Sequence, residues 1–429
     1  MLIPSNVFSR GYLKFLFTIL KNQFKKQFTN VKIKMFTFVN QIYQIMNLEQ
    51  LFLDNKEKTI EGRYLTLESI EPILNRINTD NQLSIIGQSV QERPIYKYII
   101  GTGKTKIYLW SQMHGNESTT TKALFDFLNL LHSGSDLAKS FLDSFTFCCL
   151  PMLNPDGAVL YTRANANEID LNRDSQDLTQ PESKLLRAVF EEFKPDYCYN
   201  LHDQRTIFGV ANTGKPATVS FLAPSYNEER EINDSRQKAI NLIAGMNEVL
   251  QKFIPGQIGR FDDSFNINCI GDTFQFLGVP TILFEAGHYP NDYEREVTRK
   301  YIFIALVSSF KFLNENVIET NRTDDYLNIP QNKVVFYDFI YKKIKINYDG
   351  NEKITNFAAQ YKEELVEGKI NFNAYIVKVD DLDGFFGHEV FDAQGGLYED
   401  DDENFPKLDQ KANFCLDKNI NFVNGLIKK

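Results

Sequence analysis

Two histidines and two glutamates occupy positions that suit metal-assisted hydrolysis. His114 and Glu117 are separated by two residues, so both can bind one metal ion if the chain turns sharply, which Gly115 permits. His202 and Glu285 lie downstream, each at the end of a short apolar run typical of a buried strand. Two imidazoles and a carboxylate suit zinc, and a spare carboxylate suits proton transfer. These residues predict a hydrolytic zinc site.

A second group of polar residues lies between the two histidines. Asn154–Gly157 has the composition of a tight turn, and Arg163 and the run Asp170–Asp174 follow it. An arginine fork binds a carboxylate through two hydrogen bonds, so Arg163 and Arg173 can hold the anionic end of a substrate. For an isolated arginine a surface ion pair is the commoner role, and these residues alone leave that alternative open.

The elements expected around these residues alternate between strands and helices. Apolar runs predict buried strands, and apolar residues at helical spacing predict helices between them. The strands are Lys106–Trp110, Phe145–Leu150, Tyr197–Leu201 and Thr281–Glu285, and the helices are Thr119–Leu131, Glu182–Phe193 and Asn233–Phe253. This order predicts an α/β fold with a mixed, mostly parallel sheet flanked by helices. In such sheets, ligands collect at the carboxyl ends of strands.

Three segments are expected to follow a leader. Residues 46–315 form the predicted catalytic domain, 316–332 a polar linker, and 333–429 a small β-rich accessory domain. In the last, Val334–Tyr348 and Ile370–Val379 are rich in β-branched and aromatic residues, which favours strands. After the first of these, Asp349-Gly350 is a turn signal.

Residues 1–45 are expected to be a basic leader, either disordered or absent from the native protein, with Met46 as the alternative start. Residues 1–48 contain seven Lys and Arg residues and no Asp or Glu. The apolar patch Tyr12–Leu20 is too short to cross a bilayer, and no small-residue cleavage site follows it. A peripheral membrane anchor is the minority alternative, because the segment is basic and aromatic.

Composition limits the partners and the compartment. The net charge of −9 gives no reason to expect nucleic-acid binding. Of five cysteines, Cys148, Cys149 and Cys198 sit in apolar runs, where buried free thiols are expected. An odd count without a signal peptide indicates a reducing compartment, so we expect the cytoplasm and no membrane association. The oligomeric state is not predicted.

As a set, these motifs resemble the zinc carboxypeptidase (metallocarboxypeptidase) family. The resemblance spans residues 60–315 and rests on His114-x-x-Glu117, Asn154-Pro155-Asp156-Gly157, Arg163, Asn172-Arg173, His202 and Glu285, in that order. The family binds zinc through two histidines and a glutamate.

The resemblance implies a role for each matching residue. His114, Glu117 and His202 would bind one zinc ion per chain, and Glu285 would be the general base that passes a proton to the leaving amine. Arg163 would polarise the scissile carbonyl and stabilise the oxyanion. Asn172 and Arg173 would hold the terminal carboxylate of a peptide. The implied activity is removal of C-terminal residues from peptides.

One departure from the family concerns a mobile tyrosine upstream of the catalytic glutamate. Residues 259–273 contain Phe261 and Phe265 but no tyrosine, although Tyr289 lies just past Glu285. In the same region, Asp262, Asp263 and Asp272 favour a basic or amine-bearing substrate, unless they are only solvated.

Other functions remain open. An N-acyl amino-acid deacylase of the aspartoacylase and succinylglutamate desuccinylase type shares the His-Gly-Asn-Glu and Asp-Leu-Asn-Arg motifs. Its acyl-amino-acid substrate also has a free carboxylate. Asn154–Gly157 and the run Thr162-Arg163-x-Asn165 favour the carboxypeptidase instead. An amidase for peptidoglycan stem peptides is a third enzyme. An inactive relative that serves as a binding module would lack a metal ligand or the general base, whereas this sequence contains all of them. A structural zinc site would be rich in cysteine, which the predicted site is not.

Four further residues are weaker candidates. His132 and His388 are expected to be surface or structural residues. His288 is close enough to Glu285 in sequence to line the pocket. Asp203 directly follows His202, but strand alternation would direct its side chain to the opposite face, so we leave it out of the predicted site.

Overall fold

The computed structural model describes residues 47–315, 321–348, 350–400 and 403–428. The chain forms two compact units, Met1–Asp54 and Asn55–Lys429. The first is described only over residues 47–54, which are helical. The predicted leader and Met46 therefore lie outside the described residues, and every element below belongs to the second unit.

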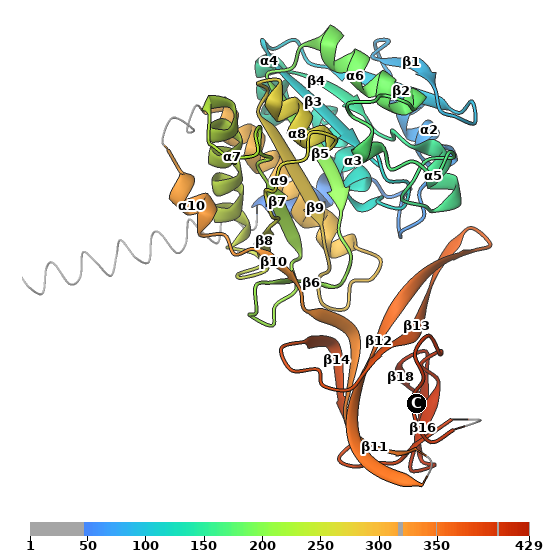
Figure 1. Ribbon diagram of the computed structural model, residues 1–429. Coiled ribbons are helices and arrows are strands. Elements are labelled where there is room, and N and C mark those ends of the chain that lie inside the picture. The colour runs from blue at the N-terminus through green and yellow to red at the C-terminus, as the bar shows by residue number, and fades with distance from the viewer. Residues whose placement is uncertain (1–46, 316–320, 349, 401–402, 429) are drawn as a thin grey trace, which may run out of the picture. The chain divides into compact units, whose positions relative to one another are not determined.

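An eight-stranded sheet forms the centre of this unit, in the order β1-β2-β4-β3-β5-β9-β7-β8 (Figure 1). The strands are β1 Leu83–Gln88, β2 Pro94–Ile100, β3 Thr105–Ser111, β4 Phe145–Leu150, β5 Tyr197–Asp203, β7 Val219–Leu222, β8 Ile258–Arg260 and β9 Thr281–Ala286. The four central strands β4, β3, β5 and β9 are parallel, whereas β1, β2 and β7 join antiparallel neighbours. The carboxyl ends of β3, β5 and β9 therefore meet at one edge.

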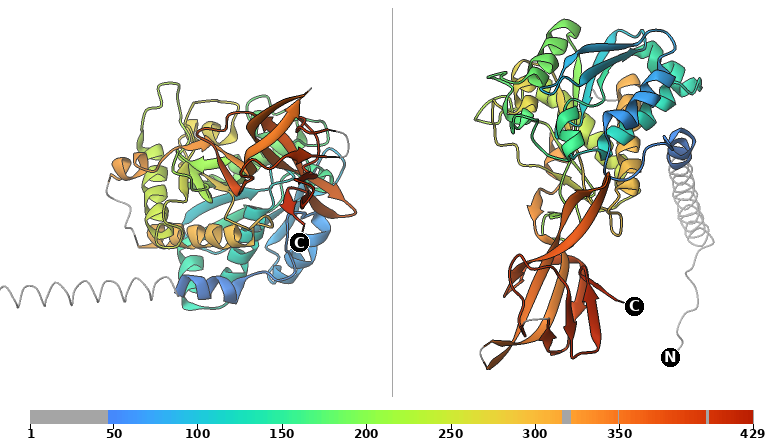
Figure 2. Two further views of the ribbon diagram at one scale, coloured as in Figure 1. Left: turned by 90° about the horizontal axis from the view of Figure 1, so that it is seen from below. Right: turned by 90° about the vertical axis from the view of Figure 1, so that its right-hand side faces the viewer.

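Helices cover both faces of the sheet (Figures 1 and 2). They are α2 Leu67–Ile77, α3 Thr119–Leu131, α4 Asp136–Ser144, α5 Pro155–Leu160, the 3-10 helix η1 Leu171–Arg173, α6 Pro181–Phe193, α7 Asp234–Leu250, α8 Ile270–Phe276, α9 Glu296–Asn314 and α10 Thr323–Leu327. Helix α9 contacts both α3 and α7, and all three helices contact β9. Among the described residues, none of the helices combines the length and the apolar character that crossing a membrane requires.

Aromatic residues fill the core on both faces. On one face, the ring of Phe310 in α9 lies 4.9 Å from Phe127 in α3 and 5.0 Å from Phe147 in β4. On the other, Phe274 in α8 stacks on Phe190 in α6 at 3.9 Å. Because both faces are covered, the central strands are apolar at nearly every position, which is the pattern that predicted them.

The predicted fold class is confirmed. All four predicted strands are present as β3, β4, β5 and β9, and predicted helix Thr119–Leu131 coincides with α3. Helix α6 starts one residue before its predicted start. Helix α7 ends at Leu250, three residues before predicted Phe253, because residues 251–253 form turns.

The C-terminal region consists of two four-stranded sheets. They are built from β11 Phe336–Tyr348, β12 Asn351–Val366, β13 Lys369–Val379 and β14 Phe386–Asp392, and from β15 Tyr398–Glu399, β16 Phe414–Leu416, β17 Ile420–Val423 and β18 Leu426–Ile427. Aromatic rings pack between them, with Phe414 of the second sheet 5.0 Å from Tyr341 and 5.3 Å from Phe357 of the first. Of the predicted turn, Asp349 lies outside the described residues and Gly350 has a φ of +82°.

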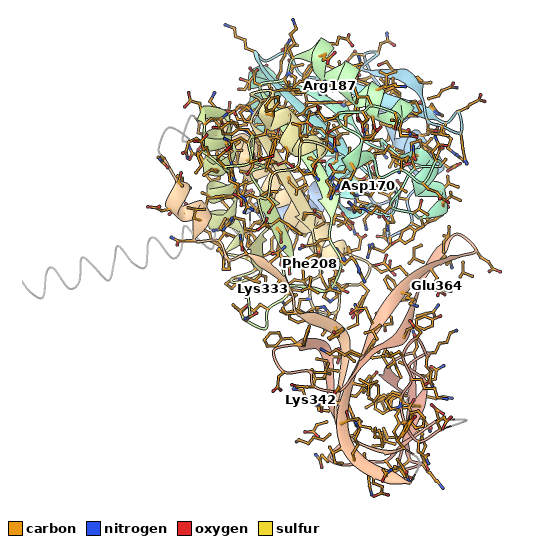
Figure 3. All side chains as sticks on the ribbon, in the orientation of Figure 1. Asp170, Arg187, Phe208, Lys333, Lys342 and Glu364 are labelled. Carbon is orange, nitrogen blue, oxygen red and sulfur yellow. The ribbon has the colours of Figure 1, made fainter. Side chains whose placement is uncertain are left out.

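The predicted linker at 316–332 contains ordered elements. Residues 316–320 lie outside the described residues, α10 follows, and β10 (Asn332–Val334) pairs antiparallel with β6 (Phe208–Val210). Figure 3 labels Phe208 and Lys333 on these two strands. The C-terminal region is thus tied to a loop that follows β5, and the division into catalytic domain, linker and accessory domain stays a prediction.

Candidate metal centre and its pocket

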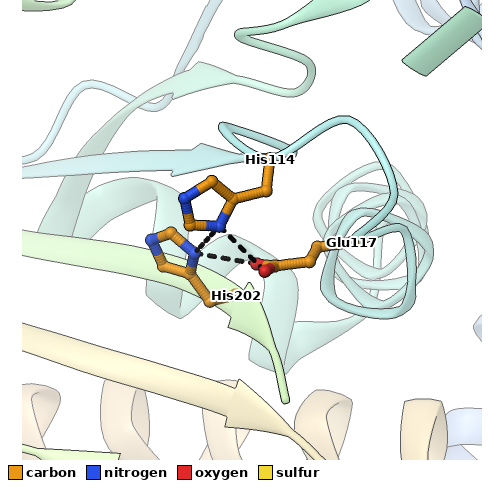
Figure 4. A group of neighbouring side chains, drawn as sticks. All are labelled: His114, Glu117 and His202. Carbon is orange, nitrogen blue, oxygen red and sulfur yellow. Dashed lines mark hydrogen bonds and ion pairs between the residues drawn. The ribbon is translucent and has the colours of Figure 1, made fainter. Parts of the chain in front are cut away.

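Three side chains converge at the carboxyl edge of the sheet (Figure 4). His114 follows β3, Glu117 precedes α3, and His202 lies near the end of β5. His114 Nδ1 lies 2.8 Å from Glu117 Oε1, and His202 Nδ1 lies 2.8 Å from Glu117 Oε2. The two Nδ1 atoms are 3.1 Å apart. One ligand atom from each residue lies within 4.8 Å of the others, and all three residues are buried.

The turn that carries this cluster packs directly on a second turn. A Cβ at Gly115 would lie 1.9 Å from the backbone carbon of Gly157, so no larger residue fits there. Asn154 Nδ2 donates to Met113 O at 3.2 Å, and Gly157 N donates to Asn154 Oδ1 at 2.8 Å. Glycine is therefore needed for the close approach of two backbones, and the two predicted motifs form one structure.

The charges of the three residues suit a divalent cation. Burial acts to raise the pKa of Glu117, but His114 and His202 outweigh it, so the pKa is lowered and the carboxylate stays ionised. Burial lowers the pKa of His202, which keeps its imidazole neutral. Metal ions bind ionised carboxylates and neutral imidazoles, and a set of two imidazoles with one carboxylate fits zinc.

Asp170 is a site residue that the sequence analysis did not assign. Its Oδ1 lies 3.0 Å from His114 Nε2, and its Oδ2 accepts from Arg163 Nε at 3.0 Å. The contact with His114 directs the other ring nitrogen of His114 toward the cluster. Burial acts to lower the pKa of His114, but Glu117 and Asp170 outweigh it and raise the pKa. In the sequence, the only indication that Asp170 belongs to the site is its position directly before Leu171-Asn172-Arg173.

The three predicted substrate-contacting residues lie beside this cluster. Arg163 Nη1 is 3.3 Å from Glu117 Oε1, and its side chain is 49% exposed. Asn172 Oδ1 accepts from the backbone N of Ile270 at 3.0 Å, which ties η1 to the start of α8. Arg173 Nη1 donates to the backbone O of Asn172 at 2.7 Å. Both arginines line the pocket described below.

Glu285 lies beside His202 on the neighbouring strand, since the two residues are paired in the β5–β9 register. Its Oε2 has no hydrogen-bond partner among the described residues. Loss of solvent, followed by the charges of Glu117 and Asp203, raises its pKa well above the ordinary value of 4.5. A raised pKa makes a carboxylate a stronger base, which suits it to proton transfer.

All seven predicted site residues line one pocket of about 640 Å³. Phe208, Phe261 and Phe265 also line it, with the rings of Phe208 and Phe261 5.2 Å apart. Phe261 and Phe265 come from residues 259–273, the segment in which the resemblance would place a mobile tyrosine and which contains none. Tyr289 is not among the described residues that line the pocket.

The three acidic residues of this region have different environments. Asp262 and Asp272 line the pocket, and burial raises the pKa of Asp272 to about 7. Asp263 is not among the lining residues, and it instead pairs with Arg236 and with Arg230 at 3.4 Å. Of the three aspartates expected to favour a basic substrate, only Asp262 and Asp272 therefore lie where a bound substrate could contact them.

The residues left outside the predicted site also have defined contacts. Asp203 accepts from Thr119 N at 2.9 Å and Thr120 N at 3.2 Å, which positions the start of α3. Contrary to the alternation argument, Asp203 lines the pocket. The His288 and His388 rings lie 4.1 Å apart, and His132 Nε2 lies 2.6 Å from Tyr98 OH.

The fold and this cluster define a mixed α/β protein with a candidate metal centre at the carboxyl edge of its sheet. Residues 71–203 match the family model of the zinc carboxypeptidases. The predicted resemblance to that family is therefore confirmed. The matched segment includes the three metal-binding candidates, Arg163, Asn172 and Arg173, and it ends before Glu285.

Several known proteins share part of this chain. "Probable carboxypeptidase 2" of Arthroderma benhamiae is 23% identical over 158 residues, which are 37% of this chain and 28% of that protein. "Carboxypeptidase E" of Caenorhabditis elegans is 30% identical over 151 residues, which are 29% and 32% of the two chains. The chain thus spans less than a third of the length of these relatives. A putative carboxypeptidase A from Shewanella denitrificans OS-217 superposes with a TM-score of 0.49 at 17% identity, over 58% and 69% of the chains.

Proposed function

We propose that this protein is a zinc-dependent carboxypeptidase that removes C-terminal residues from peptides. The observation that supports the proposal most is the composition of one pocket: a His–Glu–His cluster, an acid with a raised pKa and two arginines line the same cavity. Metal, base and carboxylate receptor are the three components that the reaction needs. The family match over residues 71–203 supports the same activity.

The zinc ion would be held by His114, Glu117 and His202. When bound, zinc supplies Lewis-acid chemistry, which lowers the pKa of a water molecule to about 7 and polarises a carbonyl group. Glu117 provides the negative charge and the two imidazoles the neutral ligands. Asp170 holds the His114 ring in its orientation through a 3.0 Å contact.

Glu285 is the general base of the proposed reaction. Its free Oε2 can take a proton from the attacking water, and its raised pKa lets it hold that proton until the leaving amine accepts it. Arg163, partly exposed beside Glu117, would donate to the oxygen that becomes negative. Asn172 and Arg173 would bind the terminal carboxylate, for which an arginine fork is well suited.

We also propose that Asp272 interacts with the side chain of the residue that is removed. It lines the pocket together with Arg173, at a position where its carboxyl is almost fully buried. Ionised Asp272 would favour a basic side chain. The cytoplasm is the proposed location, supported by five free cysteines of which three are buried.

Product analysis by mass spectrometry tests this proposal. Zinc-loaded protein and a chelated control are incubated with peptides that have free or amidated C-termini, and with N-acetyl-aspartate and N-succinyl-glutamate. We expect chelator-sensitive removal of single residues from free C-termini only. Cleavage of the acyl amino acids with intact peptides would instead identify a deacylase, and no cleavage would favour the amidase or an inactive relative.

A further inference from the structure

The C-terminal β region reaches the segments that carry the proposed active site. Glu363 in β12 forms an ion pair with Arg63 at 3.1 Å and accepts a hydrogen bond from the hydroxyl of Tyr161. Glu363 is only 27% exposed, and Arg63 and Tyr161 are buried. In Figure 1 the β12–β13 hairpin extends toward α5, the helix that Tyr161 caps. A partly buried carboxylate of the C-terminal β region thus contacts two buried residues, Arg63 and Tyr161, that lie outside that region.

Tyr161 lies two residues before Arg163 in the chain. It has a left-handed backbone, with a φ of +56°, and it ends α5. Residue Thr162 is hydrogen-bonded on both sides: its N donates to Gly157 O at 2.9 Å, and its O accepts from Asn116 N at 3.2 Å. Asn116 lies between the proposed ligands His114 and Glu117. The segment 161–163 is therefore short, twisted and attached to the metal-binding turn.

Arg63, the other partner of Glu363, contacts the end of the metal-binding turn at Ser118. The backbone O of Arg63 accepts from Ser118 Oγ at 2.6 Å, and Ser118 directly follows Glu117. The Arg63 guanidinium also lies 3.5 Å from the backbone O of Tyr293. Glu363 thus contacts, through one residue each, the segment that carries Arg163 and the segment that carries Glu117.

We propose that Glu363 is a positioning residue for Arg163, so that the C-terminal β region is part of the active-site scaffold. Glu363 holds the Tyr161 hydroxyl, Tyr161 fixes the start of the segment 161–163, and this segment sets where the Arg163 guanidinium lies relative to Glu117 and Asp170. The proposal rests on the carboxypeptidase function proposed above, in which Arg163 stabilises the oxyanion.

Three substitutions in the full-length, zinc-loaded protein separate this role from general stability. Glu363→Gln removes the charge, and Tyr161→Phe removes only the hydroxyl while the Arg63–Glu363 ion pair is kept. Glu364→Gln is the matched control: this neighbour, labelled in Figure 3, contacts Asn373 at 2.6 Å and Tyr375 at 3.3 Å within its own hairpin. Zinc content and thermal midpoint are measured for each variant.

Arg163 acts in the transition state, so its displacement changes kcat more than KM. For Glu363→Gln and Tyr161→Phe we expect kcat on a free-C-terminus peptide to fall about 10- to 100-fold, with KM and zinc content nearly unchanged. Glu364→Gln should match the wild type. In an Arg163→Ala background, Tyr161→Phe should have no further effect on kcat. Unchanged kcat for folded Tyr161→Phe, or a full additional loss in the Arg163→Ala background, would overturn the proposal.

Hydrogen exchange gives a second readout that needs no activity. Backbone amides of residues 161–163 should exchange several-fold faster in Glu363→Gln and Tyr161→Phe, while amides of α9 keep their wild-type rate. Faster exchange throughout the protein, or no change at 161–163, would contradict positioning. If the wild type cleaves no peptide, the carboxypeptidase proposal fails, and this measurement still decides whether Glu363 holds the segment.

Discussion

At the scale of single residues, the proposed chemistry depends on how charge is divided among three carboxylates. Glu117 is held ionised by two imidazoles, whereas the pKa of Glu285 is raised by loss of solvent and by the negative charges of Glu117 and Asp203. Asp170 takes neither role and instead joins His114 to Arg163. Environments that separate the pKa values of neighbouring acids assign one to metal binding and another to proton transfer.

Glu285→Gln tests the assignment of the base. The amide cannot accept the proton, so we expect kcat to fall by a factor of about 10² to 10⁴, while one zinc per chain is retained. Turnover and zinc content are measured on the same sample. Glu191→Gln, an exposed residue of α6, is the control. Normal turnover in a zinc-loaded Glu285→Gln sample would remove Glu285 from the base role.

Arg173→Ala tests the carboxylate receptor. Loss of a charge-assisted hydrogen bond costs about 1.5–3 kcal/mol, so kcat/KM for a peptide with a free C-terminus should fall about 10- to 100-fold. Slow cleavage of the matching amidated peptide, where the wild type shows any, should change little. Arg187→Ala on α6 is the control. An equal loss on both peptides would contradict the assignment.

Asp272→Asn tests the side-chain preference. The neutral amide removes the attraction for a basic side chain, so the ratio of kcat/KM for C-terminal Lys to that for C-terminal Leu should fall about tenfold or more. Competition between the two peptides in one reaction measures this ratio directly. A ratio that stays constant would assign Asp272 to structure alone.

At the scale of elements, a buried ion pair joins the helices that cover one face of the sheet. Arg299 in α9 donates to both oxygens of Asp126 in α3, at 2.7 and 2.6 Å, and both side chains are fully buried. Arg299 also donates to the backbone O of Glu57 and of Ile60, each at 2.8 Å. This network fixes α3, whose first turn adjoins Glu117.

Asp126→Ala leaves the Arg299 charge buried without its main partner. We expect the free energy of unfolding to fall by about 3–5 kcal/mol, measured by urea denaturation. Asp143→Ala at an exposed position of α4 should change it by less than about 0.5 kcal/mol. A similar small change for Asp126→Ala would show that the pair contributes little to stability.

Sequence patterns predicted the buried elements more fully than the exposed ones. Helix α3 and strands β3, β4, β5 and β9 are long apolar runs with two covered faces, so their patterns were clear. The edge strands β1 and β8 were not predicted: β1 has no fully buried position, and β8 has only three residues. Asp170 was missed because its partner His114 is 56 residues away, and Glu363 because its partner Tyr161 is 202 residues away. Such contacts depend on the folded arrangement.

At the scale of the whole molecule, buried titratable groups of the C-terminal β region lie against residues near the proposed site. His388 Nε2 lies 2.9 Å from the backbone O of Thr206, and its ring is 4.1 Å from His288. Tyr293 OH donates to Asp338 at 2.9 Å. Thr206 directly follows Arg205, which lines the pocket, so this junction lies beside the proposed site.

His388 should make stability depend on pH. Burial lowers its pKa from 6.5 to about 4, so between these values the unfolded chain binds more protons than the folded one. The free energy of unfolding therefore falls as pH drops through that window, by up to about 3 kcal/mol from this residue. His288 acts in the same direction, whereas the raised pKa of Asp338, about 6, acts in the opposite one.

Urea denaturation between about pH 4 and pH 7, with a chelator present throughout, measures this dependence without a contribution from metal release. In His388→Gln, the fall in unfolding free energy across the window should be smaller than in the wild type. Equal slopes for the two proteins would show that His388 titrates normally in the folded state.

The central claim, a carboxypeptidase with one zinc per chain, is tested most directly by titrating metal-stripped protein with zinc. Release of the C-terminal amino acid from a peptide is followed at each addition. We predict that activity rises in proportion to zinc and reaches its plateau at one equivalent per chain, with single residues as the released product. Activity that is independent of zinc, or cleavage at internal bonds of the peptide, would contradict the claim.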